Sequence, residues 1–105
     1  MNTKLHSLPR PARPVTVPGG GTLHVRDLSL AELREIDRRA DGVGAELQIR
    51  YAVLVCAYAL ANEDGTPLFP DRSAEDLDAV ECLTPAQLGA VAEAALPTKA
   101  DAKNG

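Results

Sequence analysis

Residues 59–69 read A-L-A-N-E-D-G-T-P-L-F. An apolar helical pattern ends there in acids, a glycine and a proline, and the apolar pair Leu68 and Phe69 follows. Gly65 favours a tight turn, because glycine adopts backbone conformations with positive φ at little cost. We therefore predict a fixed corner at which Leu68 and Phe69 fold back toward the preceding helix.

The helix before this corner is predicted to run from about residue 45 to residue 62, and it is apolar on two sides. One side carries Leu47, Tyr51, Leu54 and Tyr58, and the other carries Ile49, Val53, Cys56 and Leu60. The two sides are nearly opposite, since an offset of two residues is a rotation of about 200° around a helix. A helix that is apolar all round is covered on both sides. Either the domain covers both sides itself, or one side is left for a second copy of the chain or for another protein.

Serine or threonine caps mark the starts of three further helices. Each cap is followed, three residues later, by a residue that can return a hydrogen bond to the backbone of the cap, which is the capping-box pattern. The pairs are Ser29 with Glu32, Ser73 with Asp76, and Thr84 with Gln87, and Asp71 is an alternative cap to Ser73. Pro97 ends the last helix. We expect about four helices, packed around the central apolar helix.

Two β-prone runs, residues 15–17 and 22–25, flank a Pro-Gly-Gly-Gly segment and predict a short N-terminal β-hairpin. The predicted fold class is therefore α-dominant α+β. Residues 1–14 are rich in proline and basic side chains and are expected to be a flexible arm. Residues 15–97 would form a single domain, and residues 98–105 a disordered tail.

The chain has 105 residues and a formal net charge of −4. Residues 62–81 are the most acidic part, with seven acids against one base. An acidic balance argues against nucleic acid as the main partner, because binding to phosphates needs a basic face. The longest apolar run, residues 51–61, has about half of the roughly 20 residues that a membrane span needs. We expect a soluble cytosolic protein that acts on neither nucleic acid nor membrane.

The residues with catalytic or metal-binding chemistry form no recognisable pattern. His6 and His24 have no partner at the spacing of a zinc site, and Cys56 and Cys82 lie far apart without a C-x-x-C companion. Residues 62–71 are rich in oxygen ligands but lack the spacing of a calcium-binding EF-hand loop. We predict no catalytic residue, no metal site and no cofactor, and hence a protein that is not an enzyme.

The order of these features over about residues 15–96 resembles the small tail assembly chaperones of long-tailed bacteriophages. V-R-D-L-S-L-A-E-L at residues 25–33 precedes the apolar helix, which carries Leu54, Ala57, Leu60 and Ala61. In that family such a helix runs into an acidic E/D-D-G-x-x-L-F segment, here at residues 63–69. An acidic capped helix follows, and then L-T-P-A-Q-L-G-A-V-A-E-A-A-L at residues 83–96.

The resemblance implies a protein that binds the long, helical tape measure protein, keeps it soluble and helps to recruit subunits of the major tail tube protein. It also implies action in the host cytoplasm and absence from the mature virion. Tape measure helices present apolar stripes, and these suit a helix-in-groove contact. We expect the partner to contact one side of the apolar helix and the corner beside it. The predicted partner-binding residues are Leu47, Tyr51, Leu54, Tyr58, Leu68 and Phe69.

Two other functions fit parts of the pattern. A head–tail connector or another structural component of the virion could use the hairpin to add a strand to a neighbouring subunit. A small DNA-binding regulator could use the last two helices as a helix-turn-helix. However, its reading helix would lie within residues 85–96, which contain no lysine or arginine.

Overall fold

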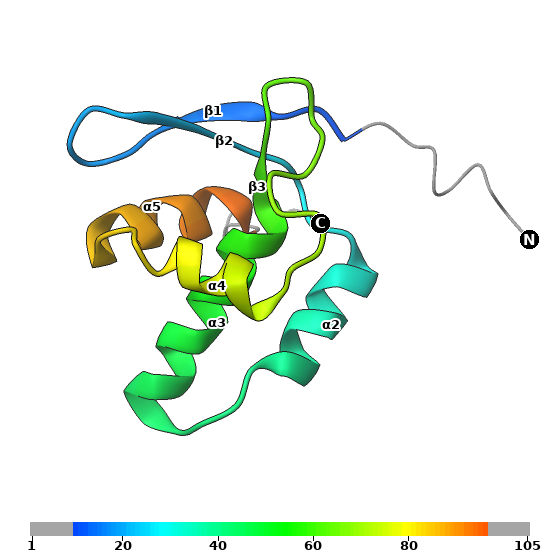
Figure 1. Cartoon of the computed structure of the whole chain (residues 1–105), viewed down its shortest axis with the longest axis vertical. Helices are drawn as coiled ribbons and strands as arrows, with labels where there is room; N and C mark the ends of the chain where they lie inside the picture. The colour runs from blue at the N-terminus through cyan, green and yellow to red at the C-terminus, as the bar shows by residue number, and fades with distance from the viewer. Residues whose placement is uncertain (1–9, 97–105) are drawn as a thin grey trace, which may run out of the picture.

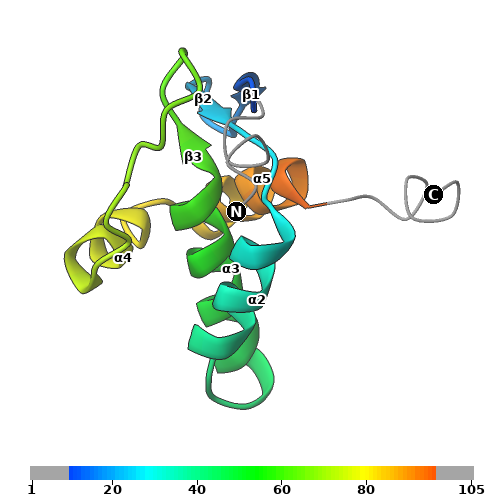
Figure 2. The same cartoon turned by 90° about the vertical axis from the view of Figure 1, so that its right-hand side faces the viewer.

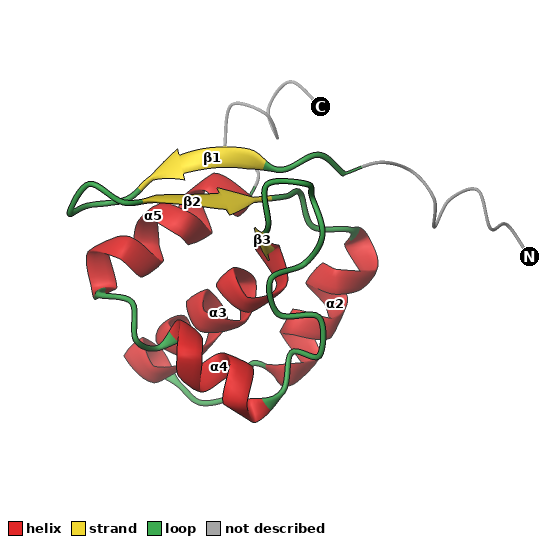
Figure 3. Ribbon diagram, turned by 45° about the horizontal axis from the view of Figure 1, so that its top comes forward, coloured by secondary structure: helices red, strands yellow, loops and turns green. Residues whose placement is uncertain are grey.

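The computed structural model describes residues 10–96 (Figure 1). This part of the chain contains four helices and one three-stranded antiparallel sheet, so the predicted α+β class is confirmed. In chain order the elements are β1 (Arg13–Thr16), β2 (Thr22–Val25), α2 (Leu30–Arg39), α3 (Gly44–Ala59), β3 (Leu60–Ala61), α4 (Ala74–Val80) and α5 (Pro85–Ala95). Figure 3 shows the sheet lying across one end of the helices, with α5 beneath β1 and β2.

The strands follow one another in the order β1-β2-β3. β1 pairs with β2 so that Arg13 lies opposite Val25, and β1 therefore begins two residues before the predicted strand. Most of the predicted arm and all of the predicted tail lie outside the described residues. Within the described part, Arg10 and Arg13 already contact the domain through ion pairs with Glu32 and Asp27.

All three predicted capping boxes are present, at the starts of α2, α4 and α5. At α2, the Ser29 hydroxyl accepts a hydrogen bond from the Glu32 N–H at 3.1 Å. The Glu32 carboxylate in turn accepts one from the Ser29 N–H at 2.9 Å. This reciprocal pair satisfies two backbone donors of the first turn. It also holds the Glu32 carboxylate over the start of α2.

The prediction that the apolar helix continues to about residue 62 is wrong. α3 ends at Ala59, and Leu60–Ala61 forms β3, which pairs with β2 through Val25 and His24. The backbone of this segment finds its partners in β2 and in the loop that follows, instead of in a further helical turn. For example, the N–H of Leu68, in that loop, donates to the Leu60 carbonyl at 2.9 Å. Strand pairing with distant residues thus ends the helix, although the local sequence would allow it to continue.

The predicted turn is present at the corner. The Asn62 N–H donates to the Thr66 carbonyl at 2.8 Å, and the Gly65 N–H donates to the Asn62 carbonyl at 3.0 Å. Gly65 has φ +90°, the left-handed region that glycine tolerates best. The Leu68 N–H bond described above then returns the chain to the end of α3. The predicted fold-back of residues 68–69 is therefore confirmed.

The core is built from aliphatic residues around the C-terminal half of α3. Residues 53–61 are all buried, and α3 contacts α2, α4 and α5. Figure 2 shows α3 between these three helices, with the sheet above them. The largest fully buried side chains are Val25, Ile36, Leu54, Val55, Cys56, Val80 and Val91.

Candidate functional site

α3 is divided along its length into a buried half and an exposed half. Residues 44–50 are exposed, whereas residues 53–59 are buried on every side. Figures 1 and 2 both show the N-terminal end of α3 extending beyond α4 and α5, with only α2 beside it. Val43, just before the helix, is 84% exposed, and Ile49 is 54% exposed. The uncovered apolar surface is thus at one end of the helix and not along one side.

A groove of about 540 Å³ lies between α2 and this end of α3. It is lined by Asp37, Ala40, Leu47, Gln48 and Tyr51. Leu47 and Tyr51 are one helical turn apart, so their side chains lie on the same side of α3. We call Val43, Leu47, Ile49 and Tyr51 the apolar tip. Its residue types can bind apolar side chains but supply no reactive group.

The six residues predicted to bind a partner do not form one surface. Leu47 and Tyr51 lie at the apolar tip, whereas Leu54, at 1% exposure, and Tyr58 are buried in the core. A partner cannot touch Leu54 or Tyr58 in the folded protein, and this part of the prediction is corrected. Helical periodicity identifies a side of a helix, but it does not say how far along that side the neighbouring helices reach.

Leu68 and Phe69 lie at the other end of α3, beside β3. Leu68 is exposed, and Phe69 is half-buried and packs against the core. From residue 47 to residue 60 the chain advances about 20 Å along a helix, at 1.5 Å per residue. The apolar tip and the 68–69 pair are therefore separate surfaces.

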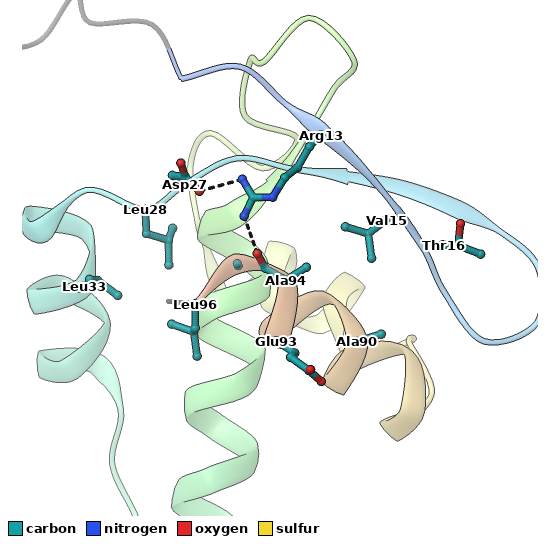
Figure 4. Close-up of a pocket in the computed structure, with 11 residues that line it drawn as sticks. Arg13, Val15, Thr16, Asp27, Leu28, Leu33, Ala90, Glu93, Ala94 and Leu96 are labelled. Carbon is teal, nitrogen blue, oxygen red and sulfur yellow. Dashed lines mark hydrogen bonds and ion pairs between the residues drawn. The ribbon is translucent and has the colours of Figure 1, made fainter. Parts of the chain in front are cut away.

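A second cavity, of about 840 Å³, lies between β1, α2 and the end of α5 (Figure 4). Arg13 crosses its rim, where one guanidinium nitrogen donates to Asp27 Oδ1 at 2.7 Å and the other to the Ala94 carbonyl. The contact with Ala94 places a cation at the negative end of the α5 dipole. Among the described residues that line this cavity there is no histidine or cysteine. Its lining is Arg13, Val15, Thr16, Asp27, Leu28, Leu33, Ala90, Glu93, Ala94, Ala95 and Leu96.

Three arginines from distant segments converge on Glu32. Arg10 Nη1 lies 2.5 Å from Glu32 Oε1, while Arg72 Nη2 and Arg26 Nη2 lie 3.2 Å and 3.4 Å from Glu32 Oε2. We call Arg10, Arg26, Arg72 and Glu32 the arginine cluster. Sequence analysis missed it because the arginines are 22, 6 and 40 positions from Glu32 and share no motif.

Burial, hydrogen bonds and neighbouring charges together shift the pKa of two members of the arginine cluster. Burial alone would raise the pKa of Glu32, but the Ser29 N–H and Arg10 outweigh it and lower that pKa. Burial lowers the pKa of Arg26, and the neighbouring charge of Arg10 acts in the same direction. The Arg72 guanidinium also lies over the ring of Tyr58, 4.6 Å from its centre. The cluster thus combines ion pairing with cation–π stacking.

The described residues offer little reactive chemistry. Residues 10–96 contain no group of three or more His, Cys, Asp or Glu side chains placed to hold a metal ion. Burial raises the pKa of Cys56 to about 12, so its thiol is protonated and unreactive near neutral pH. No helix in the described part of the chain is both long enough and apolar enough to cross a membrane.

Comparisons of the chain with protein-family models, with curated proteins and with solved structures found no match. The two strongest features are the apolar tip and the arginine cluster.

Proposed function

We propose that this chain is a non-catalytic tail assembly chaperone of a long-tailed bacteriophage. It would bind the tape measure protein, keep it soluble and help to recruit tail tube subunits in the host cytoplasm, and it would leave before the virion matures. The resemblance over residues 15–96 supports this proposal. The structural observation that carries it is the apolar tip of α3, which the domain leaves uncovered.

In this proposal the two halves of α3 have different roles. The buried half is the central helix around which α2, α4 and α5 pack, and the N-terminal hairpin closes the domain over α5. The exposed half presents the apolar tip to a helix of the tape measure protein. Amphipathic helices bind grooves through apolar anchors about one turn apart. Leu47 and Tyr51 have that spacing and line a groove.

The free energy of such a contact comes mainly from burying apolar side chains. Full burial of a side chain as large as valine or leucine contributes about 1.5 to 3 kcal/mol. Val43 precedes α3 and is largely exposed, and Leu47 lines the groove. Covering these two side chains would supply a few kilocalories per mole before the entropy cost of association is subtracted. Replacing both with charged residues should therefore abolish a contact at this surface.

Co-expression with the tape measure protein tests the proposal. The wild-type chain should increase the soluble fraction of the tape measure protein and co-elute with it. The double variant Val43→Asp, Leu47→Asp should do neither while keeping the wild-type circular dichroism spectrum. Leu30→Asp is the matched control, because Leu30 is an exposed leucine in the first turn of α2, outside the groove.

Two outcomes would count against the proposal. If the wild-type chain leaves tape measure solubility unchanged and forms no complex, the chaperone function is wrong. If the double variant behaves like the wild type, the partner binds elsewhere on the domain.

The second candidate, a structural component of the virion, is favoured by one observation. β1 is an edge strand of the sheet, and an edge strand can pair with a strand of another chain. Pro14 lies within β1 and cannot donate a backbone hydrogen bond, which restricts such pairing. Detection of the chain in purified mature particles would favour this candidate over a chaperone that departs.

A further inference from the structure

The arginine cluster holds more positive charge than its carboxylate neutralises. Three guanidinium groups and one carboxylate leave a formal surplus of two positive charges. The nearby Asp27 does not remove this surplus, because its carboxylate pairs with Arg13 and Arg10 meets only its backbone carbonyl. Like charges held together in a partly buried site repel one another. An additional anion at this place would therefore be stabilised.

The cluster also contains hydrogen-bond donors without acceptors. The Nε atoms of Arg26 and Arg72 are buried and have no hydrogen-bond partner among residues 10–96. Arg26 as a whole is only 8% exposed. A buried donor without a partner costs about 1 to 3 kcal/mol, and more when the group is charged. The site thus lacks acceptors as well as negative charge.

The cluster opens to solvent on the side formed by Arg10 and Arg72. Their side chains are 33% and 19% exposed, and they come from the segment before β1 and the loop before α4. Tyr58 lies beneath the Arg72 guanidinium and supports its plane. Planar guanidinium groups held in this way match the paired oxygens of phosphate and carboxylate groups.

We propose that the arginine cluster is a binding site for an oxyanion, with Arg10 and Arg72 as the contacting residues and Arg26 as a buried positive charge behind them. The oxyanion would be a phosphate group free in solution or a carboxylate on an acidic side chain of a partner protein. The net charge of −4 opposes long-range attraction of anions. Binding must therefore come from direct guanidinium contacts. This site lies apart from the apolar tip, and the inference does not depend on the proposed chaperone function.

Titration of the whole chain with inorganic phosphate at constant ionic strength tests the inference. We expect saturable shifts of the Nε–Hε NMR signals of Arg26 and Arg72, together with a higher melting temperature. A parallel titration with a short glutamate-rich peptide distinguishes the two sources. Tighter binding of phosphate would identify a free phosphate group as the ligand, and tighter binding of the peptide would identify an acidic side chain.

Variants separate a specific site from a general charge effect. Arg72→Gln should weaken phosphate binding about tenfold or more, as expected for the loss of a hydrogen bond to a charged group. Arg10→Gln should act in the same direction and gives a second test if Arg72→Gln does not fold. Arg50→Gln is the matched control, because it removes the same charge from an exposed ion pair with Asp41.

The inference is overturned if neither ligand produces saturable shifts in the wild-type protein. It is also overturned if chloride produces the same shifts as phosphate. Equal weakening by Arg50→Gln and Arg72→Gln would have the same meaning, because net charge alone would then explain the effect. None of these results would bear on binding at the apolar tip.

Discussion

Glu32 accepts a backbone hydrogen bond from Ser29 and contacts three arginines through the same carboxylate. These contacts join the segment before β1, the end of β2, the start of α2 and the loop before α4. Truncating one partner of a buried charge network leaves the remaining charges uncompensated. The ionised carboxylate is therefore the form that stabilises the fold.

The pH dependence of stability follows from the lowered pKa of Glu32. Its ordinary value is 4.5, and its value in the folded protein lies below that. The contribution of ionised Glu32 is complete above about pH 4.5 and is lost as the pH falls through the lower, folded value. Glu32→Gln should remove this pH-dependent component and cost about 3 kcal/mol at neutral pH. Urea unfolding measured from neutral to acidic pH checks both effects.

Glu35→Gln is the control for this prediction, because Glu35 also lies on α2 and pairs with one arginine, Arg38, at the surface. An exposed pair of this kind contributes about 0 to 1 kcal/mol. If the unfolding free energy of Glu32→Gln falls with acid as much as that of the wild type, the pH dependence does not come from Glu32.

Gly65 provides a second test at the residue scale. It has φ +90°, and a Cβ atom at this position would lie 3.0 Å from the Arg10 carbonyl oxygen. Gly65→Ala should therefore destabilise the protein by about 1 to 3 kcal/mol. Gly89→Ala should instead stabilise it by about 0.5 to 1 kcal/mol, because Gly89 is helical and faces open space. Chemical denaturation measures the unfolding free energy of both variants. Equal changes in the two variants would contradict the prediction that they differ in sign.

At the scale of elements, α3 and its C-terminal neighbour β3 organise the domain. The C-terminal half of α3 is wholly apolar and buried, whereas its N-terminal half mixes apolar residues with Glu46, Gln48 and Arg50 and is exposed. β3 then turns the chain out of the helix and into the sheet. One half of α3 thus forms the core, and the other half presents a surface of mixed polar and apolar side chains.

Two leucines on α3, two turns apart, should respond very differently to truncation. Leu54→Ala should cost about 2 to 5 kcal/mol, because it leaves a cavity in the core. Leu47→Ala should cost less than about 1 kcal/mol, since Leu47 lies at the exposed end of the helix. Urea denaturation midpoints measure the difference. Similar losses in the two variants would mean that the N-terminal half of α3 is covered as well.

At the scale of the whole molecule, the sheet and the helices enclose one aliphatic core. Cys56 lies within this core, and Cys82 is exposed after α4. The Cys56 thiol is both inaccessible and hard to ionise, since burial raises its pKa to about 12. The two cysteines therefore report separately on the surface and on the opening of the core.

Thiol labelling of the native protein should modify Cys82 quickly and Cys56 only when the core opens. Adding urea should raise the rate at Cys56 in parallel with global unfolding measured by circular dichroism. A Cys82→Ser variant isolates the Cys56 signal and serves as the control. Rapid labelling of Cys56 in the absence of urea would show that α3 separates from the core locally.

Short-range patterns were enough to predict the capping boxes at Ser29, Ser73 and Thr84 and the turn at Gly65. Each depends on residues a few positions apart, whose backbone hydrogen bonds form within the segment itself. β3 could not be predicted in this way, because Leu60 and Ala61 become a strand through pairing with residues in β2. The arginine cluster could not be predicted from short-range patterns either, because its members meet only after distant segments have packed together.

The sequence by itself determined an α+β domain with capped helices, a tight corner and a helix apolar on two sides. It also predicted Leu47 and Tyr51 as partner-binding residues. Only the tertiary structure decided that Leu54 and Tyr58 are buried, that Leu68 and Phe69 lie on a separate surface, and that three arginines share one carboxylate. The physical reason is that propensity and hydrogen bonding along the chain are local. Burial and charge pairing depend on which distant segments arrive at the same place.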